Sequence, residues 1–329
     1  MIENIAFIVI GITLLVWSAD RFTDGAAAIA RNLGVSRLIV GLTIVAIGSS
    51  APEIFVSILD SLKTCAPDKP DCGPEVAIGN ALGSNITNIA LVLGITALVR
   101  PLMIHSGLLK REIPILFLSS AAAFVFFWDY RLSHTEGFIL LTGLVFYFFW
   151  LVRVGIQSRK EHDPMVDEMI DELPEGMPTG KATFWVILGL VLLVGSSKLL
   201  IEGASGIAST FGVSETVIGL TIVALGTSLP ELGASVASVL KNEHEIAIGN
   251  VIGSNIFNLL GVLGIPAAIA APVIEKNILH IDYPLMLGLI IAMAIMAYGF
   301  RGPGRINRIE GTILVAVFLG YYIVRFFVL

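Results

Sequence analysis

One thirteen-residue segment occurs twice in the chain, as GLTIVAIGSSAPE from Gly41 to Glu53 and as GLTIVALGTSLPE from Gly219 to Glu231. Each copy places a carboxylate directly after a proline inside an apolar stretch. At membrane depth a glutamate costs a few kcal/mol or more unless it faces a partner or a wet cavity. Two glutamates in equivalent places therefore predict a cation site that the two copies build together.

The composition is that of an integral membrane protein. Hydrophobic residues make up 56% of the chain and charged residues 14%, with a mean hydropathy of +0.89, whereas soluble proteins carry about 25% charged residues. A membrane-spanning helix needs about 20 apolar residues. We therefore predict an all-α, polytopic protein of the cell membrane (inner or plasma), with ten spanning helices that begin near Ile5, Ser36, Glu75, Ile113, Thr135, Thr183, Glu215, Glu245, Asp282 and Arg308.

The repetition extends beyond the thirteen residues. An offset of 178 superposes Gly34-Val35-Ser36 on Gly212-Val213-Ser214, and an offset of 170 aligns residues 75–94 with residues 245–264. The signatures fall on the second and seventh predicted helices, and this odd separation reverses the direction in which a segment crosses the membrane. The sequence thus predicts two inverted-topology five-helix repeats, a pattern typical of secondary transporters with a site near the midplane. Duplication for packing alone does not explain paired intramembrane glutamates.

We divide the chain into a first repeat at 1–157 with its motif at 41–94, an acidic cytoplasmic linker at 158–181, and a second repeat at 182–329 with its motif at 219–264. The linker is either a solvated connector or a cytoplasmic cation sensor, and its apolar spacing favours a short amphipathic helix. With the N-terminus outside, thirteen basic residues lie at cytoplasmic helix ends and five outside. Basic residues favour the cytoplasmic side, so we expect both termini outside.

Cysteines occur at two positions, Cys65 and Cys72, in the loop that we place outside. They form either a short disulfide-closed loop or two free thiols.

The prolines of the two signatures predict helix breaks. Pro52 and Pro230 remove a backbone donor and clash with the carbonyls of Gly48 and Gly226. Carbonyls freed at membrane depth must be buried or line a cavity, where they can bind cations. Hydroxyl and amide side chains accompany the glutamates, namely Ser49, Ser50, Thr227 and Ser228 in the signatures and Ser84, Asn88, Ser254 and Asn258 in the partner helices. Glycines at 79, 83, 249 and 253 predict close backbone approach there.

The candidate ligands are carboxylates, hydroxyls, amide oxygens and backbone carbonyls, without thiols or imidazoles. Such hard oxygen ligands suit Ca²⁺, Na⁺ or Mg²⁺. Two carboxylates neutralise one Ca²⁺, and monovalent ions can share the same oxygens, so that the ions compete for one site. No HExxH, GxSxG or Walker sequence is present, and we expect neither an enzyme nor a prosthetic group.

The duplicated G-S/T-S-x-P-E and GSNxxN motifs resemble the alpha repeats of the Ca²⁺/cation antiporter superfamily, especially those of short prokaryotic Na⁺/Ca²⁺ exchangers. The resemblance covers essentially the whole chain. It implies ten helices, a four-helix ion-binding core, and two long tilted gating helices, the first and the sixth.

Carried over by motif position, the resemblance also implies a ligand set. For Ca²⁺ it implies the carboxylates of Glu53 and Glu231 with the carbonyls of Ser49 and Thr227. For Na⁺ it adds Ala46, Ser50, Ser84, Ala224, Ser228 and Ser254, while Asn88 and Asn258 complete the centre. Some prokaryotic relatives carry Asp at the position of Asn258, so the Na⁺ stoichiometry and the participation of protons stay open.

Several functions compete on the sequence alone. The leading one is an alternating-access antiporter in which entering Na⁺ drives Ca²⁺ out, and the alternative in the same class is Ca²⁺/H⁺ or K⁺-assisted exchange. A cation channel would need ring-like selectivity elements, which the two-fold pattern lacks, and a structural membrane scaffold would not respond to Ca²⁺. We expect a monomer whose partners are Ca²⁺, Na⁺ and the lipid bilayer, without nucleic acid.

Overall fold

The computed structural model describes residues 2–62, 75–104, 106–160, 176–211, 224–298 and 304–327, and nearly all of them are helical. Within these ranges six helices or helical runs are long and apolar enough to cross a membrane, and a bent pair adds a seventh. The six are α1 (Ile2–Leu33), the run from α5 (Glu75–Thr87) through η2 (Asn88–Leu93) to α6 (Gly94–Val99), α8 (His134–Lys160), α10 (Thr179–Thr210), the run from α14 (His244–Phe257) through η4 (Asn258–Val262) to α15 (Gly264–Ala270), and η5 (Ile278–Asp282) with α16 (Tyr283–Tyr298). The chain is a multi-pass membrane protein.

The described helices follow the predicted segments with one clear shift. α7 (Ser106–Phe126) begins well before Ile113, where we placed its start, because the helix accommodates the charged run Lys110-Arg111-Glu112. α17 (Arg308–Phe327) begins where it was predicted. The predicted start of the seventh span near Glu215, both cysteines, and most of the acidic linker lie outside the described residues, and the division at 157 and 182 stays a prediction.

The chain forms two compact units that interleave along the sequence. The first comprises Met1–Ser49 and Phe146–Asn250, and the second comprises Ser50–Val145 and Val251–Leu329. Both units contain segments of both predicted repeats.

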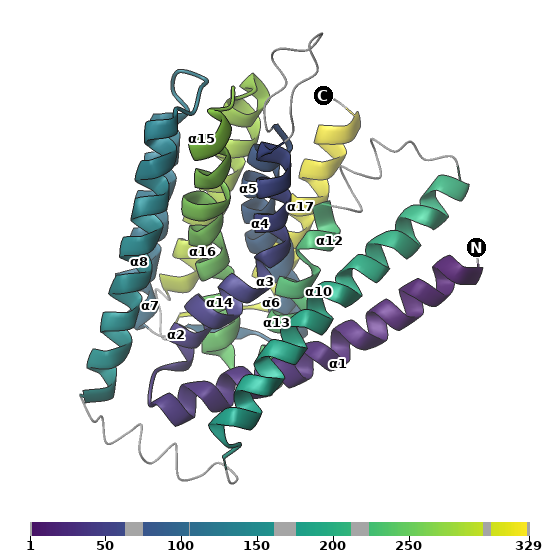
Figure 1. Cartoon of the computed structure of the whole chain (residues 1–329), viewed down its shortest axis with the longest axis vertical. Helices are drawn as coiled ribbons and strands as arrows, with labels where there is room; N and C mark the ends of the chain where they lie inside the picture. Colours follow the sequence, from purple (N-terminus) through teal and green to yellow (C-terminus); the bar gives the residue numbers. More distant parts are fainter. Residues whose placement is uncertain are drawn as a thin grey trace. The chain divides into compact units, whose positions relative to one another are not determined.

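The first unit is organised around α1 and α10, which lie side by side along their lengths (Figure 1). Their contacts run in opposite directions along the two helices. A Cβ on Gly25 would lie 2.8 Å from the carbonyl oxygen of Ala182, and a Cβ on Gly203 would lie 2.6 Å from that of Asn4. The offset of 178 converts one contact into the other, and it also relates the approach of Gly11 to Leu200 with that of Gly189 to Phe22. The two duplicated helices therefore pack as an antiparallel, symmetric pair.

Both helices of this pair exceed the thickness of a bilayer core. Each has 32 residues, which at 1.5 Å per residue is about 48 Å, against a hydrocarbon core of about 30 Å. This confirms the predicted length of the first and sixth helices. Helices of this length fit a bilayer by tilting.

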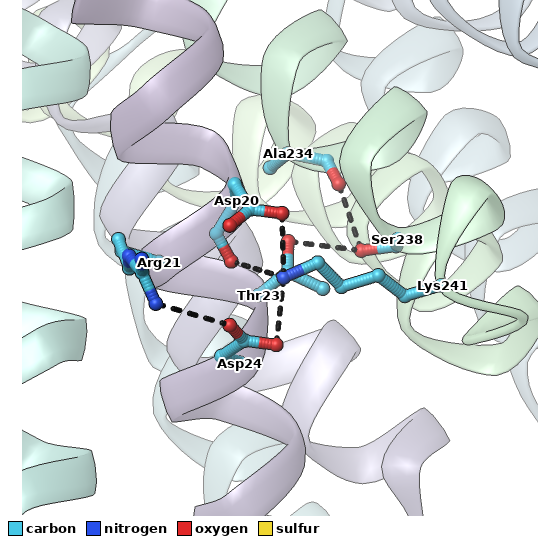
Figure 2. A network of polar contacts seen from close by, with 7 residues as sticks. All are labelled: Asp20, Arg21, Thr23, Asp24, Ala234, Ser238 and Lys241. Carbon is cyan, nitrogen blue, oxygen red and sulfur yellow. Dashed lines mark hydrogen bonds and ion pairs between the residues drawn. The ribbon is translucent and has the colours of Figure 1, made fainter.

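A polar network ties α1 to α13 (Leu229–Leu240) within the first unit (Figure 2). The Lys241 ammonium lies 2.7 Å from the Asp20 carboxylate and 2.6 Å from that of Asp24, and it donates to the main-chain carbonyl of Asp20 at 2.7 Å. Nearby, the hydroxyls of Thr23 and Ser238 lie 3.5 Å apart. Lys241 thus anchors the end of α13 on one face of α1.

The second unit gathers α4 (Ala51–Ser61), α5, α7, α15, α16 and α17. A two-stranded antiparallel sheet links β1 (Leu102–Ile104) with β2 (Gly304–Ile306), pairing Leu102 with Ile306. The buried Tyr283 hydroxyl donates to the main-chain carbonyl of Ser120 at 2.6 Å, joining α16 to α7. α17 packs along η2 and α6.

Large apolar side chains remain exposed on many helices, among them Phe55, Val125, Trp128, Phe146 and Val191, each more than half exposed. So much exposed apolar surface is unusual for a soluble protein. These exposed apolar side chains are suited to contact with lipid.

We predict that Lys241→Met loosens α1 from α13. The substitution keeps the aliphatic stem but removes the cation, leaving Asp20 and Asp24 facing each other. Because these groups are partly exposed, we expect a loss of about 1 kcal/mol in unfolding free energy. Thermal unfolding in detergent should show a midpoint lower by roughly 2–4 °C. Lys181→Met, at an exposed position near the start of α10, is the control, and equal midpoints for the two variants would contradict the anchor.

Candidate functional site

Both signatures contain a helix break two residues before the proline. In the first, α2 (Arg37–Val40), η1 (Gly41–Val45) and α3 (Ala46–Ser49) end before Ser50, and α4 continues at an angle of 46°. In the second, α12 (Ala224–Thr227) ends before Ser228, and α13 follows. Ser50 has φ −82° and ψ 11°, and Ser228 has φ −89° and ψ 3°, which lies in the sparsely populated bridge region. The predicted breaks are confirmed, and the two copies share one backbone conformation.

The glutamates lie in the first turn after each break. Pro52 and Pro230 are second residues of the new helices, where a missing N–H costs little. Glu53 and Glu231 follow directly, and each is only 1% exposed. A helix N-terminus carries partial positive charge, so this position favours the ionised carboxylate while burial opposes it. The structure thus places both acids in equivalent, water-poor surroundings.

One of the carbonyls freed by the prolines already has a partner. The Ser197 hydroxyl on α10 donates to the main-chain carbonyl of Gly226, which is the one that Pro230 deprives of its helical donor. That oxygen is therefore occupied within the protein. The predicted carbonyl ligands, at Ser49 and Thr227, are different ones.

The predicted partner side chains are buried near the ends of α5 and α14 and at the first residues of η2 and η4. Ser84, Asn88, Ser254 and Asn258 all belong to the buried set. In the second unit the Ser50 hydroxyl donates to the Ser254 hydroxyl at 3.1 Å, which joins the first signature to the second GSN motif. Asn88 and Asn258 each begin a π-helical turn, a distortion that is frequent at functional sites.

Several candidate ligand atoms are buried and have no hydrogen-bond partner among the described residues. They are the Oδ1 and Nδ2 atoms of Asn88, Oδ1 of Asn258 and Oγ of Ser228. A buried polar group without a partner costs about 1–3 kcal/mol, and native proteins usually satisfy such groups with protein, water or ions. The three oxygen atoms in this set are suited to bind a cation.

The other predicted residues are distributed over both units. In the first unit Ser49 and Glu231 both connect to Asn250, as the Ser49 hydroxyl donates to Asn250 Oδ1 at 3.0 Å and Asn250 Nδ2 donates to the carbonyl of Glu231 at 3.2 Å. The carbonyl of Ala46 lies 3.5 Å from the Ser49 hydroxyl. Ala224 begins α12. Glu53 and Glu231 belong to different units, and their pairing remains a prediction.

Several polar residues of the partner helices that contact the site were not predicted from the sequence. Asn80 and Asn250 bond to the main chain of the two glutamates. Asn85 accepts from Asn258 Nδ2 at 3.2 Å. All of these asparagines lie in the segments that the offset of 170 aligns, and each recurs in both copies. This recurrence would have identified them, whereas the prediction considered only the asparagine that lies four residues after the serine of each motif.

Two further buried acids, Glu112 and Asp282, also follow the repeat. The offset of 170, extended past residue 94, aligns Glu112-Ile113-Pro114 with Asp282-Tyr283-Pro284. Both carboxylates are buried, and Asp282 accepts a hydrogen bond of 2.9 Å from the Tyr321 hydroxyl. The duplication therefore includes the fourth helix of each predicted repeat.

The glycine prediction holds at one position and is not shown at others. A Cβ on Gly249 would lie 2.8 Å from the carbonyl of Leu38 and 3.0 Å from the Cα of Gly41, so these backbones approach closely in the first unit. Around Gly79 and Gly83 no atom of the described residues lies within 4 Å of an added Cβ. The residue that corresponds to Gly41 in the second signature is Gly219, which lies outside the described ranges.

Comparison with known proteins decides the family. The family described as "Sodium/calcium exchanger protein" matches residues 3–158 and 181–327. The chain belongs to the sodium/calcium exchanger family. Its relatives include CaxA of Alkalimonas amylolytica, 46% identical over 99% of both chains, and the sodium/calcium exchanger MaX1 of Methanosarcina acetivorans, 30% identical over 99% of both.

The fold agrees with a solved exchanger. A structure of the sodium-calcium exchanger NCX_Mj, soaked with Na⁺ and Sr²⁺, matches with a TM-score of 0.80 at 29% identity and covers 98% of each chain. The exchanger family consists of cation antiporters without a prosthetic group. The chain is accordingly a membrane transporter of the cation/Ca²⁺ antiport class and not an enzyme.

We predict that alanine has opposite effects at the two equivalent glycines of α14 and α5. Gly249→Ala should lower thermal stability and weaken transport, because its Cβ would press on the backbone of residues 38–42. Gly79→Ala should be neutral or stabilising, since alanine favours a helix by up to about 1 kcal/mol over glycine where space allows. Unfolding midpoints of the two purified variants test this, and equal shifts would show that the contact with Gly41 is not tight.

Proposed function

We propose that the chain exchanges Na⁺ for Ca²⁺ across the membrane by alternating access at a site built from Glu53 and Glu231. The observation that carries the proposal is the equivalent placement of the two acids: each is buried, follows the same broken backbone, and lies in the first turn of a new helix. Two carboxylates balance the charge of one Ca²⁺ and attract competing Na⁺ ions. The relative MaX1 is a sodium/calcium exchanger, and the solved neighbour NCX_Mj is a sodium-calcium exchanger.

Around the carboxylates we propose the ligand set that the motifs indicate. For Ca²⁺ the carbonyls of Ser49 and Thr227 would add oxygen ligands. For Na⁺ and the surrounding centre the proposed residues are Ala46, Ser50, Ser84, Asn88, Ala224, Ser228, Ser254 and Asn258. The unsatisfied buried oxygens of Asn88, Asn258 and Ser228 support this assignment.

The proposed architecture has ten spanning helices in two inverted repeats. The antiparallel, symmetric packing of α1 on α10 supports the inversion, and their length supports a role as gating helices. From the distribution of basic residues we propose that both termini lie outside. We further propose that a single chain contains the whole transport pathway.

Charge balance gives the cycle its coupling. Moving two ionised carboxylates through the low-dielectric core without cations is costly, so the site changes its exposure readily only when ions occupy it. Na⁺ entering down its gradient then displaces Ca²⁺ on one side and is displaced on the other. Because the empty site does not cross readily, each Ca²⁺ that leaves on one side is replaced by Na⁺, and the two ions are exchanged.

Ca²⁺/H⁺ exchange, or exchange assisted by K⁺, remains the second candidate. The specific reason is Asn258, an amide at the position where the resemblance allows an Asp. With two acids in the centre, protons can replace Na⁺ on the carboxylates if desolvation raises their proton affinity in the absence of cations.

Glu53→Gln and Glu231→Gln should each abolish Na⁺-gradient-driven Ca²⁺ uptake in proteoliposomes. Each change keeps the size of the side chain and removes one of the two charges that balance Ca²⁺. The measurement is accumulation of radioactive calcium after an outward Na⁺ gradient is imposed. Glu112→Gln, a buried glutamate on α7, is the matched control and should retain uptake. Undiminished uptake in either signature variant would remove the site assignment.

Separately imposed Na⁺, K⁺ and pH gradients should identify the coupling ion. We expect Ca²⁺ uptake with the Na⁺ gradient alone and none with a pH or K⁺ gradient alone, because the Na⁺ ions occupy the same oxygens as Ca²⁺. The measurement uses one batch of proteoliposomes with each gradient in turn. Uptake driven by pH without Na⁺ would establish the Ca²⁺/H⁺ alternative, and net Ca²⁺ leak without any counter-ion would indicate a channel.

A further inference from the structure

A pair of asparagines, Asn80 and Asn250, holds the main chain of the two signature glutamates. The repeat offset of 170 relates these residues to each other. Asn80 Nδ2 donates to the carbonyl oxygen of Glu53 at 3.4 Å, and Asn250 Nδ2 donates to that of Glu231 at 3.2 Å. The first contact lies within the second unit and the second within the first unit. The same hydrogen bond therefore forms twice, independently, in the two copies.

The position of Asn80 along α5 gives this bond a consequence for the ion site. Asn80, Ser84 and Asn88 follow one another at intervals of four residues, and residues four apart share one face of a helix. The first contacts the main chain of Glu53, and the next two belong to the proposed ion centre. α14 repeats the order with Asn250, Ser254 and Asn258. Within the second unit, fixing Asn80 against Glu53 thus fixes the height of Ser84 and Asn88 relative to that glutamate.

Asn250 is held more firmly than Asn80. Its side chain is fully buried, at 0% exposure, whereas Asn80 is partly exposed. Besides the bond to Glu231, it donates to the Ser235 hydroxyl at 2.9 Å and accepts from the Ser49 hydroxyl at 3.0 Å. The side chain thus uses both its amide nitrogen and its oxygen, and the nitrogen faces the Glu231 carbonyl because that oxygen can only accept. It also joins Ser49 of the first signature to Glu231 of the second.

We propose that Asn80 and Asn250 are positioning residues that set the register between the glutamate of each broken helix and the ion-binding face of its partner helix. They act through the glutamates and do not themselves bind the transported ion. Loss of the amide leaves the carboxylate in place but lets its backbone shift against the serine and asparagine of the site. A shift of this kind weakens Ca²⁺ binding because several oxygens must meet one ion at 2.3–2.6 Å. The inference rests on the proposed site of Glu53 and Glu231.

The test compares Asn250→Leu, Asn80→Leu and Tyr283→Phe. Leucine has nearly the shape of asparagine without its hydrogen-bonding groups. Tyr283→Phe removes a buried hydrogen bond to the main-chain carbonyl of Ser120 on another helix. It is the control for the stability lost with a buried side-chain hydrogen bond at a place away from the glutamates. The readouts are the Ca²⁺ concentration that half-saturates uptake in proteoliposomes and the Ca²⁺ concentration that half-maximally raises the unfolding midpoint in detergent.

We expect Asn250→Leu to raise both half-saturating concentrations about tenfold, which corresponds to about 1.4 kcal/mol. Asn80→Leu should raise them about two- to threefold, in line with its single longer bond. Tyr283→Phe should lower the midpoint of the Ca²⁺-free protein and leave both Ca²⁺ concentrations unchanged. Asn80, at its partly exposed position, keeps the test valid if Asn250→Leu does not fold.

Two results would overturn the proposal. One is an unchanged Ca²⁺ dependence in both asparagine variants, or in Asn80→Leu when it alone folds. The other is a rise in Tyr283→Phe as large as that in the asparagine variants, which would attribute the effect to general loss of stability. Failure of the proposed function itself would look different, because Glu53→Gln or Glu231→Gln would then retain uptake and Ca²⁺-dependent stabilisation. If the glutamate variants lose both while the asparagine variants lose neither, only the positioning role is wrong.

Discussion

A carboxylate buried in the membrane is costly unless it is neutralised or paired with a counter-charge, and this constraint explains most of what surrounds Glu53 and Glu231. Each acid lies in the first turn of a helix, where the partial positive charge of the helix end offsets part of the cost of burial. The proline before it interrupts the preceding helix and forces a bridge-region serine. In the proposed site, a bound cation would balance the charge that remains. The helix break, the buried acid and the helix N-terminus therefore occur together, and this arrangement is present in both copies.

The duplication also explains which features sequence reasoning could find. Pro52 and Pro230 predicted both breaks, because the missing donor acts locally and needs no tertiary contact. The lengths of α1 and α10 followed from the resemblance. By contrast, the roles of Asn80 and Asn250 depend on which backbone oxygen each amide reaches, and a spacing pattern along one helix does not contain that information. The start of α7 was placed too late for a different reason, because hydropathy marks where an apolar stretch begins, and the helix extends through the charged run at 110–112 that precedes it.

The two copies carry different charges at equivalent positions of α1 and α10. On α1, Asp20 and Asp24 together bind Lys241. The offset of 178 places Lys198 and Glu202 at the corresponding positions of α10, a base and an acid in place of two acids. A lysine meeting that face would encounter no net negative charge. The residue that corresponds to Lys241 is Lys63, which lies outside the described residues, so the difference in charge concerns the faces of α1 and α10 alone, while the glycine contacts between these helices are symmetric.

This asymmetry bears on how an exchanger built from two matching halves can favour one state. If the repeats were identical in every contact, inward-facing and outward-facing arrangements would have equal free energies by symmetry. In the proposed alternating-access cycle, the different charges on α1 and α10 would remove that equality, and exposed pairs worth about 1 kcal/mol would bias a two-state equilibrium about fivefold. The bias is small enough for ion binding to reverse it.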